Sequence, residues 1–191
     1  MSSMYFPARR RLIALGAGLG SAAVLGSSRP ARAAATRAEI DRDVRAATTH
    51  LRGMANAAPL FEHAHAILVF PHIIAGGLIV GGQFGEGALM RAATTQAYYN
   101  IVGASLGLLA GVQSSGLAMF FMSETALVAL MHADGWEIGT GPAVTFLDQG
   151  VQANVTSSTL REPVYAISFN QQGLMAALAL NGTKITRITP A

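Results

Sequence analysis

Short apolar runs separated by glycine and proline dominate the stretch from Ala66 to Met90. A first run ends at Pro71, and further runs are divided by glycines at positions 76, 77, 81, 82, 85 and 87. Runs of roughly four to eight Val, Ile, Leu and Phe residues with such borders are typical of buried strands, whereas a glycine inside a helix costs about 1 kcal/mol. The stretch is therefore predicted to form a strand, a turn and two more strands.

A second stretch repeats this pattern thirty residues further along the chain. The sequence GLIVGGQ from Gly77 aligns with GLLAGVQ from Gly107. Two similar glycine-interrupted hairpins predict one antiparallel sheet, because a solenoid requires more repeats. Glycine within a strand marks a bulge, a bend or a close approach of another backbone. We assign such structural roles to Gly77, Gly81, Gly82, Gly85, Gly87, Gly107 and Gly111.

Apolar residues recur with a helical period from Thr36 to Met54. Thr36 and Glu39 form a capping box at the start of this segment. The apolar positions that share one face are Ile40, Val44, Ala47, Leu51 and Met54. Two interpretations stay open, because this face either packs on the sheet or places the helix on an anionic membrane with its arginines at the headgroups.

A shorter helix is predicted from Ser123 to Ala133. Ser123 suits the N-cap, Glu124 suits the positive end of the helix dipole, and Gly135 suits the C-terminal stop. Its expected buried stripe consists of Leu127, Leu130 and Met131.

The C-terminal part of the chain has the pattern of a series of strands. A strand pair is expected to begin at Trp136, and later runs are at 151–157, 164–169, 173–180 and 184–188. Because Asn181-Gly182 is a strong hairpin signal, the last two runs are expected to pair. The chain is therefore predicted to be a single α+β domain. It has a predominantly antiparallel, glycine-rich β-sheet, sandwich or barrel-like, packed with an N-terminal amphipathic helix and a short central helix.

One alternative to this sheet is a membrane-spanning helix. Gly103, Gly107 and Gly111 fall four apart in the apolar run from Ile101 to Met122, a spacing found where membrane helices pack closely. The polar side chains at positions 113–115 and the similar segment upstream favour the sheet.

Residues 1–35 have the pattern of a cleaved export signal. Arg9, Arg10 and Arg11 precede an apolar run that ends near Gly26, and residues 31–33 form a small-residue cleavage site. The arginines favour the twin-arginine route over the general secretory one, and the apolar run is shorter than the ~20 residues of a membrane-spanning helix. We expect a periplasmic protein that can associate with the surface of a membrane as a peripheral protein, with one domain at residues 36–191.

Without the export signal, the net charge changes sign. The whole chain has 13 basic and 10 acidic residues, but five of the basic residues and none of the acidic ones lie in the signal. A nucleic-acid-binding domain would show a basic stripe, and the remaining chain shows none, so this class is excluded. The chain also has no cysteine, which excludes disulfides, thiolate metal sites and a cysteine nucleophile.

Four long motifs follow one another in the chain: FPHIIAGGLIVGGQFGEGALM from Phe70, YYNIVGASLGLLAGVQSSGLAMFFMSETAL from Tyr98, DGWEIGTGPAVTFLDQG from Asp134 and QQGLMAALALNGTKITRI from Gln171. Together they resemble the bacterial SYLF domain family over about residues 57–188. The resemblance implies a non-enzymatic lipid-binding domain. Eukaryotic relatives bind phosphoinositides, and some are tied to cortical actin. Actin is not expected as a partner in a periplasm, and His72 stands where many relatives have lysine, so phosphoinositide specificity is not expected either.

Basic side chains are the candidates for binding a lipid phosphate, and we select seven: Arg37, Arg42, Arg45, Arg52, Arg91, Lys184 and Arg187. The predicted function is a periplasmic lipid-binding or membrane-surface module with no catalytic residues, and the sequence does not define its oligomeric state. His63 and His65 have no third ligand nearby, so neither a metal nor a cofactor is expected. One alternative is an envelope hydrolase with a site around Glu86, and another is a protein-interaction module of the envelope.

Overall fold

A computed structural model of the chain describes residues 34–77, 80–106, 111–147, 160–172 and 182–191. The chain divides into two units, residues 1–33 and residues 34–191, and every described helix and strand lies in the second unit. The predicted export signal thus lies almost entirely outside the described residues.

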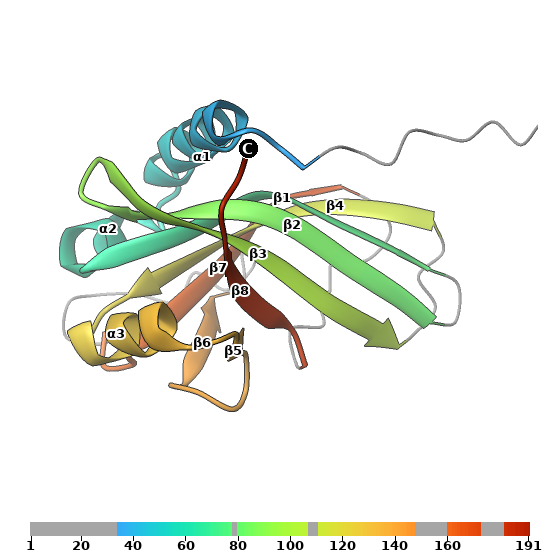
Figure 1. Cartoon of the computed structure of the whole chain (residues 1–191). Coiled ribbons are helices and arrows are strands. Elements are labelled where there is room, and N and C mark those ends of the chain that lie inside the picture. Colours follow the sequence, from blue (N-terminus) through green and yellow to red (C-terminus); the bar gives the residue numbers. More distant parts are fainter. Residues whose placement is uncertain (1–33, 78–79, 107–110, 148–159, 173–181) are drawn as a thin grey trace, which may run out of the picture. The chain divides into compact units, whose positions relative to one another are not determined.

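Three helices and eight strands are described (Figure 1). The helices are α1 (Arg37–Arg52), α2 (Ala58–His63) and α3 (Glu124–His132). The strands are β1 (Ala66–Gly77), β2 (Val80–Arg91), β3 (Thr94–Leu106), β4 (Gly111–Phe121), β5 (Trp136–Glu137), β6 (Val144–Leu147), β7 (Val164–Gln172) and β8 (Lys184–Ile188). These elements confirm the predicted α+β fold.

All eight strands belong to one curled sheet with the order β5-β8-β3-β2-β1-β4-β7-β6. Only the edge pair of β6 and β7 is parallel. The central order β3-β2-β1-β4 is that of a Greek key, in which the fourth strand returns to lie beside the first. The prediction of a second hairpin is therefore wrong, because β3 and β4 pair with opposite sides of the β1–β2 hairpin instead of with each other.

The predicted break at Pro71 is also wrong. Strand β1 runs through this residue, and its register shifts between Val69 and His72 against β2 and between Phe70 and Ile73 against β4. Proline has no N–H to donate, so a central strand accommodates it at a bulge. The two strands expected after Pro71 are the second half of β1 and β2.

The sheet buries both of its faces, each against different helices. On the first face, called the α1 face, Ile40, Val44, Ala47 and Leu51 of α1 pack with Leu60 of α2 on residues of β1, β2, β4 and β7. On the opposite face, called the α3 face, Leu127 and Leu130 of α3 pack with Trp136 on the other side chains of the central strands. The sheet is the middle layer between these two sets of helices.

The helices begin as their sequences predict. Thr36 accepts a hydrogen bond from the backbone N–H of Glu39 at 3.3 Å, and the Glu39 carboxylate accepts one from the N–H of Thr36 at 2.8 Å. This reciprocal pair is the expected capping box. Ser123 caps α3 by accepting from the N–H of Ala126 at 3.2 Å. The predicted burial of Met131 is wrong, because α3 buries Ala126 with Leu127 and Leu130 and leaves Met131 exposed.

The C-terminal strands follow the predictions in part. Strands β7 and β8 form where expected, but β5 and β6 lie at opposite edges of the sheet and do not pair with each other. The strands predicted at 151–157 and 173–180 lie outside the described residues. Within the described part of the chain, β8 pairs with β3 and β5.

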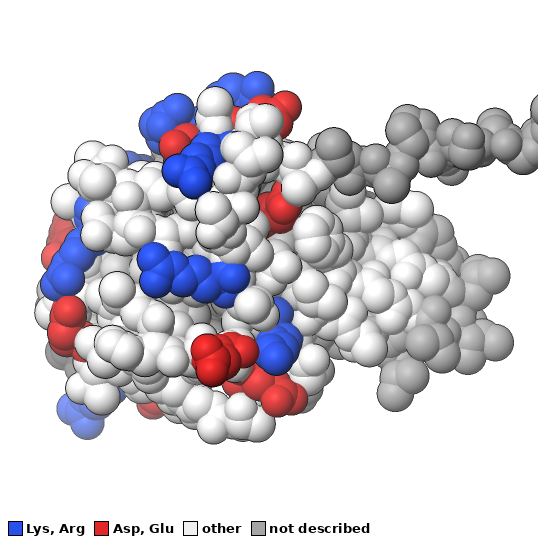
Figure 2. Space-filling model, in the orientation of Figure 1, with Lys and Arg blue, Asp and Glu red and all other residues white. Residues whose placement is uncertain are grey.

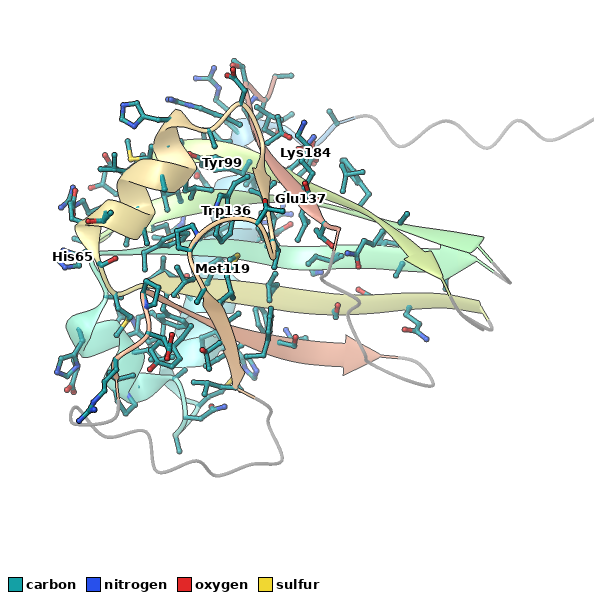
Figure 3. The ribbon with its side chains drawn as sticks, turned by 90° about the horizontal axis from the view of Figure 1, so that it is seen from below. His65, Tyr99, Met119, Trp136, Glu137 and Lys184 are labelled. Carbon is teal, nitrogen blue, oxygen red and sulfur yellow. The ribbon has the colours of Figure 1, made fainter. Side chains whose placement is uncertain are left out.

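On the α3 face, two buried polar atoms have no hydrogen-bond partner among the described residues, the Tyr99 hydroxyl and the indole nitrogen of Trp136. Figure 3 shows both side chains with Met119 on this side of the sheet. Burial raises the pKa of Tyr99, and the positive charge of Arg187 opposes this shift in part. The Tyr99 hydroxyl is therefore held in its neutral form.

Substitution of Gly116 tests how closely β4 packs against β7. A Cβ atom at Gly116 would overlap the ring of Phe169, which is fully buried. We expect Gly116→Ala to lower the free energy of unfolding by about 1–3 kcal/mol, because the ring must move in a filled core. Gly82→Ala is the matched control, since a Cβ there meets only the Gly103 carbonyl oxygen at 3.8 Å. Urea unfolding of both variants measures the difference, and an equal effect would contradict this packing.

The buried tyrosine predicts a loss of stability at alkaline pH. Because the folded state raises the pKa of Tyr99 above its ordinary value of 10.0, the folded chain binds this proton more tightly than the unfolded chain. Its contribution to stability is complete below pH 10 and is lost as the pH rises through the folded pKa. Urea unfolding between pH 8 and about 11.5 should show this decline, and Tyr99→Phe should reduce its slope. At pH 7 the variant should be as stable as the wild type, since the hydroxyl has no partner to lose.

Candidate lipid-binding surface

Helix α1 is attached to the sheet by apolar and polar contacts. Its apolar residues are almost fully buried on the α1 face. On its β3 side, Asp41 accepts hydrogen bonds from Thr95 at 2.9 Å and from the Tyr98 hydroxyl at 3.1 Å. Of the two interpretations of this helix, packing on the sheet is therefore the one the structure shows. Its apolar face is not available to a membrane while these contacts hold.

Three of the predicted lipid-binding residues, Arg37, Arg45 and Arg187, lie on the β3–β8 side of the sheet, two near Tyr98 on the α1 face and one beside Tyr99 on the α3 face. Burial raises the pKa of Tyr98, as does its hydrogen bond to Asp41, while the charges of Arg37 and Arg45 oppose the shift. Arg187 lies opposite Tyr99 in the β3–β8 register. Arg37 donates through Nε to the carbonyl oxygen of Pro190 at 3.2 Å. We call these three arginines, which flank the β3–β8 side of the sheet on its two faces, the cationic cluster.

No carboxylate of the described residues forms an ion pair with the cationic cluster. Figure 2 shows basic side chains on α1 with acidic side chains beside them, and further basic and acidic side chains lower on the same view. An arginine without a carboxylate partner keeps its guanidinium donors for an external phosphate, which it binds in a bidentate manner. The cluster therefore has the chemistry of an anion-binding surface.

The other predicted residues are engaged within the protein or lie apart from this cluster. Arg42 pairs with Asp43 at 2.9 Å, and this hydrogen bond raises the pKa of Arg42. Arg91 makes two hydrogen bonds to Glu124, at 2.9 and 3.3 Å. The Arg52 guanidinium lies 4.3 Å from the ring centroid of Phe61. Lys184 lies at the β5–β8 edge, next to Glu137 in the register (Figure 3).

Glu86 lies in the middle of β2, not in a turn. Its carboxylate accepts a hydrogen bond from the backbone N–H of Ala35 at 3.0 Å, so it holds the segment that leads into α1. Its cross-strand neighbours are His72 and Asn100, and His72 lies 4.0 Å from Asp43 of α1. His72, Glu86 and Asn100 form a polar row across the α1 face.

Beyond the polar row, the α1 face of the sheet carries apolar residues that the sequence analysis did not select. Because alternate residues of a strand share a face, Ile74, Phe84 and Val102 form one cross-strand row next to the polar row. The following row is Gly76, Gly82, Ala104 and Val112. We call these the apolar rows. Helix α1 lies over the other end of the four strands, which extend beyond it (Figure 1).

The predicted structural glycines have different surroundings. A Cβ at Gly87 would overlap the Val69 carbonyl, and one at Gly85 would lie 2.8 Å from the carbonyl oxygen of His72. Gly77 has a φ of 156° at the end of β1, Gly81 pairs with it, and Gly111 begins β4. Gly107 lies outside the described residues. Four glycines with tight surroundings are not among the predicted ones: Gly103, Gly116, Gly135 and Gly141.

The described residues contain no group of three side chains able to hold a metal ion. His63 bonds the carbonyl oxygen of Pro59 through Nδ1 at 2.9 Å, and His65 lies 3.5 Å from Glu124. In the same part of the chain, no helix is both long enough and apolar enough to cross a bilayer. The run from Ile101 to Met122 is divided between strands β3 and β4 wherever it is described.

Comparison with known proteins gives one family match. Residues 102–190 match the family model Ysc84, described as a Las17-binding protein actin regulator. This span begins within β3 and contains β4, α3 and β5 to β8. A comparison with curated proteins gives no match. The match includes most of three of the four motifs that resemble the SYLF family, so residues 102–190 are similar to the SYLF (Ysc84) domain family.

Proposed function

We propose that this protein is a non-enzymatic lipid-binding module that attaches to an anionic membrane surface on the periplasmic side. The observation that carries the proposal is the cationic cluster, in which Arg37 and Arg45 on one face and Arg187 on the other face of the β3–β8 side of the sheet have no carboxylate partner among the described residues. The similarity of residues 102–190 to the SYLF (Ysc84) family supports it.

The chemistry of the cluster fits the phosphate of an anionic phospholipid. Each basic residue near such a surface contributes about 1 kcal/mol of binding free energy, and salt screens this contribution. The remaining charges give no general attraction, because residues 36–191 carry eight basic and ten acidic residues. The local arrangement, more than the net charge, therefore supports membrane binding.

The family description names Las17 binding and actin regulation. We do not extend either to this chain, because its first 35 residues have the features of an export signal and a periplasm has no actin. The lipid contact is the part of the family's function that an exported protein retains. The engagement of Glu86 with Ala35 favours a structural role for this carboxylate over the hydrolase alternative.

The test compares two triple variants of residues 34–191 in vesicle co-sedimentation. Arg37→Gln, Arg45→Gln and Arg187→Gln together remove the cationic cluster. We expect about fivefold weaker binding per arginine, or roughly 100-fold in total, to phosphatidylglycerol vesicles at low salt. Wild-type binding should weaken at 0.5 M salt and should be weaker to phosphatidylcholine vesicles.

The control triple variant is Arg42→Gln, Arg91→Gln and Arg161→Gln, which changes the net charge by the same amount. Arg42 and Arg91 already have carboxylate partners, so this variant should lose much less affinity. Equal losses in both variants would show that only net charge matters. Absence of wild-type binding to either kind of vesicle would refute the proposed function.

A further inference from the structure

We infer that the apolar rows at the end of the sheet beyond α1 are the surface that enters the hydrocarbon region of the membrane. The inference rests on the proposed function and identifies a second surface, distinct from the cationic cluster. It assigns headgroup binding to arginines and insertion to side chains of strands β1 to β4.

The first observation is the exposure of large apolar side chains in adjacent positions. The exposed fractions are 39% for Ile74, 49% for Phe84, 47% for Val102 and 76% for Val112. Phe84 lies opposite both Ile74 and Val102 in the register, and Val112 lies opposite Gly76 in the next row. Isolated exposed apolar residues are common, but a contiguous set marks an interaction surface.

The remaining exposed large apolar residues do not form such a set. Among the described residues they are Val128 and Met131 on α3 and Phe146 on the edge strand β6. Four of the seven therefore lie on one part of one face. This concentration separates the apolar rows from the ordinary background of exposed apolar side chains.

The second observation is that α1 does not supply an insertion surface. Its apolar stripe is buried on the same face of the sheet, at the opposite end of the central strands. Insertion through α1 would require breaking this core together with the Asp41 hydrogen bonds to Thr95 and Tyr98. The apolar rows are already exposed, so they enter a membrane without any such cost.

The third observation concerns glycine in the second row. A Cβ at Gly82 would meet no atom closer than 3.8 Å, whereas one at Gly85 or Gly103 would collide with neighbouring residues. Packing within the protein therefore does not require glycine at position 82. A glycine with open space in a strand is consistent with close approach of an external molecule.

The charges around the apolar rows favour an anionic bilayer as the occupant. Lys184 lies opposite Val102 in the β3–β8 register. Glu86, the nearest carboxylate along β2, is bound to the N–H of Ala35, and Arg37 follows two residues later. Cations at the border of an apolar surface match a bilayer, in which anionic headgroups surround hydrocarbon.

The residues that define the apolar rows include no polar side chain, and polar residues border them, which argues for lipid over a protein partner. Ser114, opposite Ile74, is the polar side chain that continues the first row on β4. A specific protein interface carries about one hydrogen bond per 100–200 Å² and matches its partner in shape. A fluid hydrocarbon layer needs neither feature, so it fits a surface made of glycine, alanine, valine, isoleucine and phenylalanine.

The experiment compares two double variants of residues 34–191 that remove equivalent exposed side chains. Phe84→Ser with Val102→Thr changes the apolar rows, and Phe146→Ser with Val128→Thr is the control, whose residues are 41% and 43% exposed. We expect the first variant to bind phosphatidylglycerol vesicles about tenfold more weakly, because it buries less apolar surface in the membrane. The control should stay within about twofold of the wild type. Urea unfolding confirms that both variants fold.

Salt separates this surface from the cationic cluster. Binding that remains at 0.5 M salt should depend on Phe84 and Val102, because apolar transfer is not screened. The arginine triple variant should lose the salt-sensitive part and keep this remainder.

Direct insertion is read from a fluorescent label, which the absence of cysteine makes possible. A nitrobenzoxadiazole label on Val102→Cys should shift its emission to the blue when vesicles are added, and the same label on Val128→Cys should not shift. The inference is overturned if the label at position 102 stays in water while the protein binds vesicles. It is also overturned if the label shifts without vesicles as protein concentration rises, which would identify a second copy as the occupant. In both cases the proposed function survives if the arginine triple variant still weakens binding.

Discussion

The requirement to cover both faces of the central strands organises this fold. Strands β1 to β4 are long, and helices α1 and α2 cover only one end of their first face, while α3 and β5 pack on the second. Covered apolar side chains are stabilised by removal from water, at about 25 cal/mol per Å². The end of the first face that no described helix covers begins at the polar row of His72, Glu86 and Asn100. The core ends where the helices end, and the apolar rows beyond this point are left exposed.

Features that depend on neighbouring residues could be predicted from the sequence. The capping box of Thr36 and Glu39, the N-cap at Ser123 and the apolar stripe of α1 all involve groups within one or two helical turns. The strand order could not be predicted in this way, because the repeated glycine pattern is equally compatible with two separate hairpins and with a Greek key. The predicted strand break at Pro71 was wrong because β1 accommodates this proline in a bulge. A bulge depends on the pairing with the neighbouring strands, which the local sequence does not show. The predicted burial of Met131 was wrong because the width of the buried stripe on α3 depends on which residues of the sheet pack against this helix.

The candidate site shows the same division between local and long-range information. Sequence alone identifies the scarce basic residues, but their availability depends on distant partners such as Glu124, which engages Arg91 from 33 positions away. Only the fold brings Arg187 of β8 opposite Tyr99, and Arg37 and Arg45 of α1 near Tyr98 on the other face of β3. The apolar rows were missed because alternating apolar residues in a strand give the same signal whether or not another element covers them. The exposed fraction of Phe84, not its place in the pattern, reveals the difference.

In the proposed function, two surfaces with different physical chemistry give membrane binding two kinds of control. Attraction by the cationic cluster acts over about 8–10 Å and falls with salt, whereas burial of the apolar rows acts only on contact and is insensitive to salt. Charge can therefore set the encounter with an anionic surface, and apolar contact can set the residence time. Because α1 is fixed to the sheet through Asp41 and its apolar stripe, neither step requires the helix to unfold or detach. A rigid body that binds in this way remains reversible, since a few half-exposed side chains enter the bilayer in place of a whole helix face.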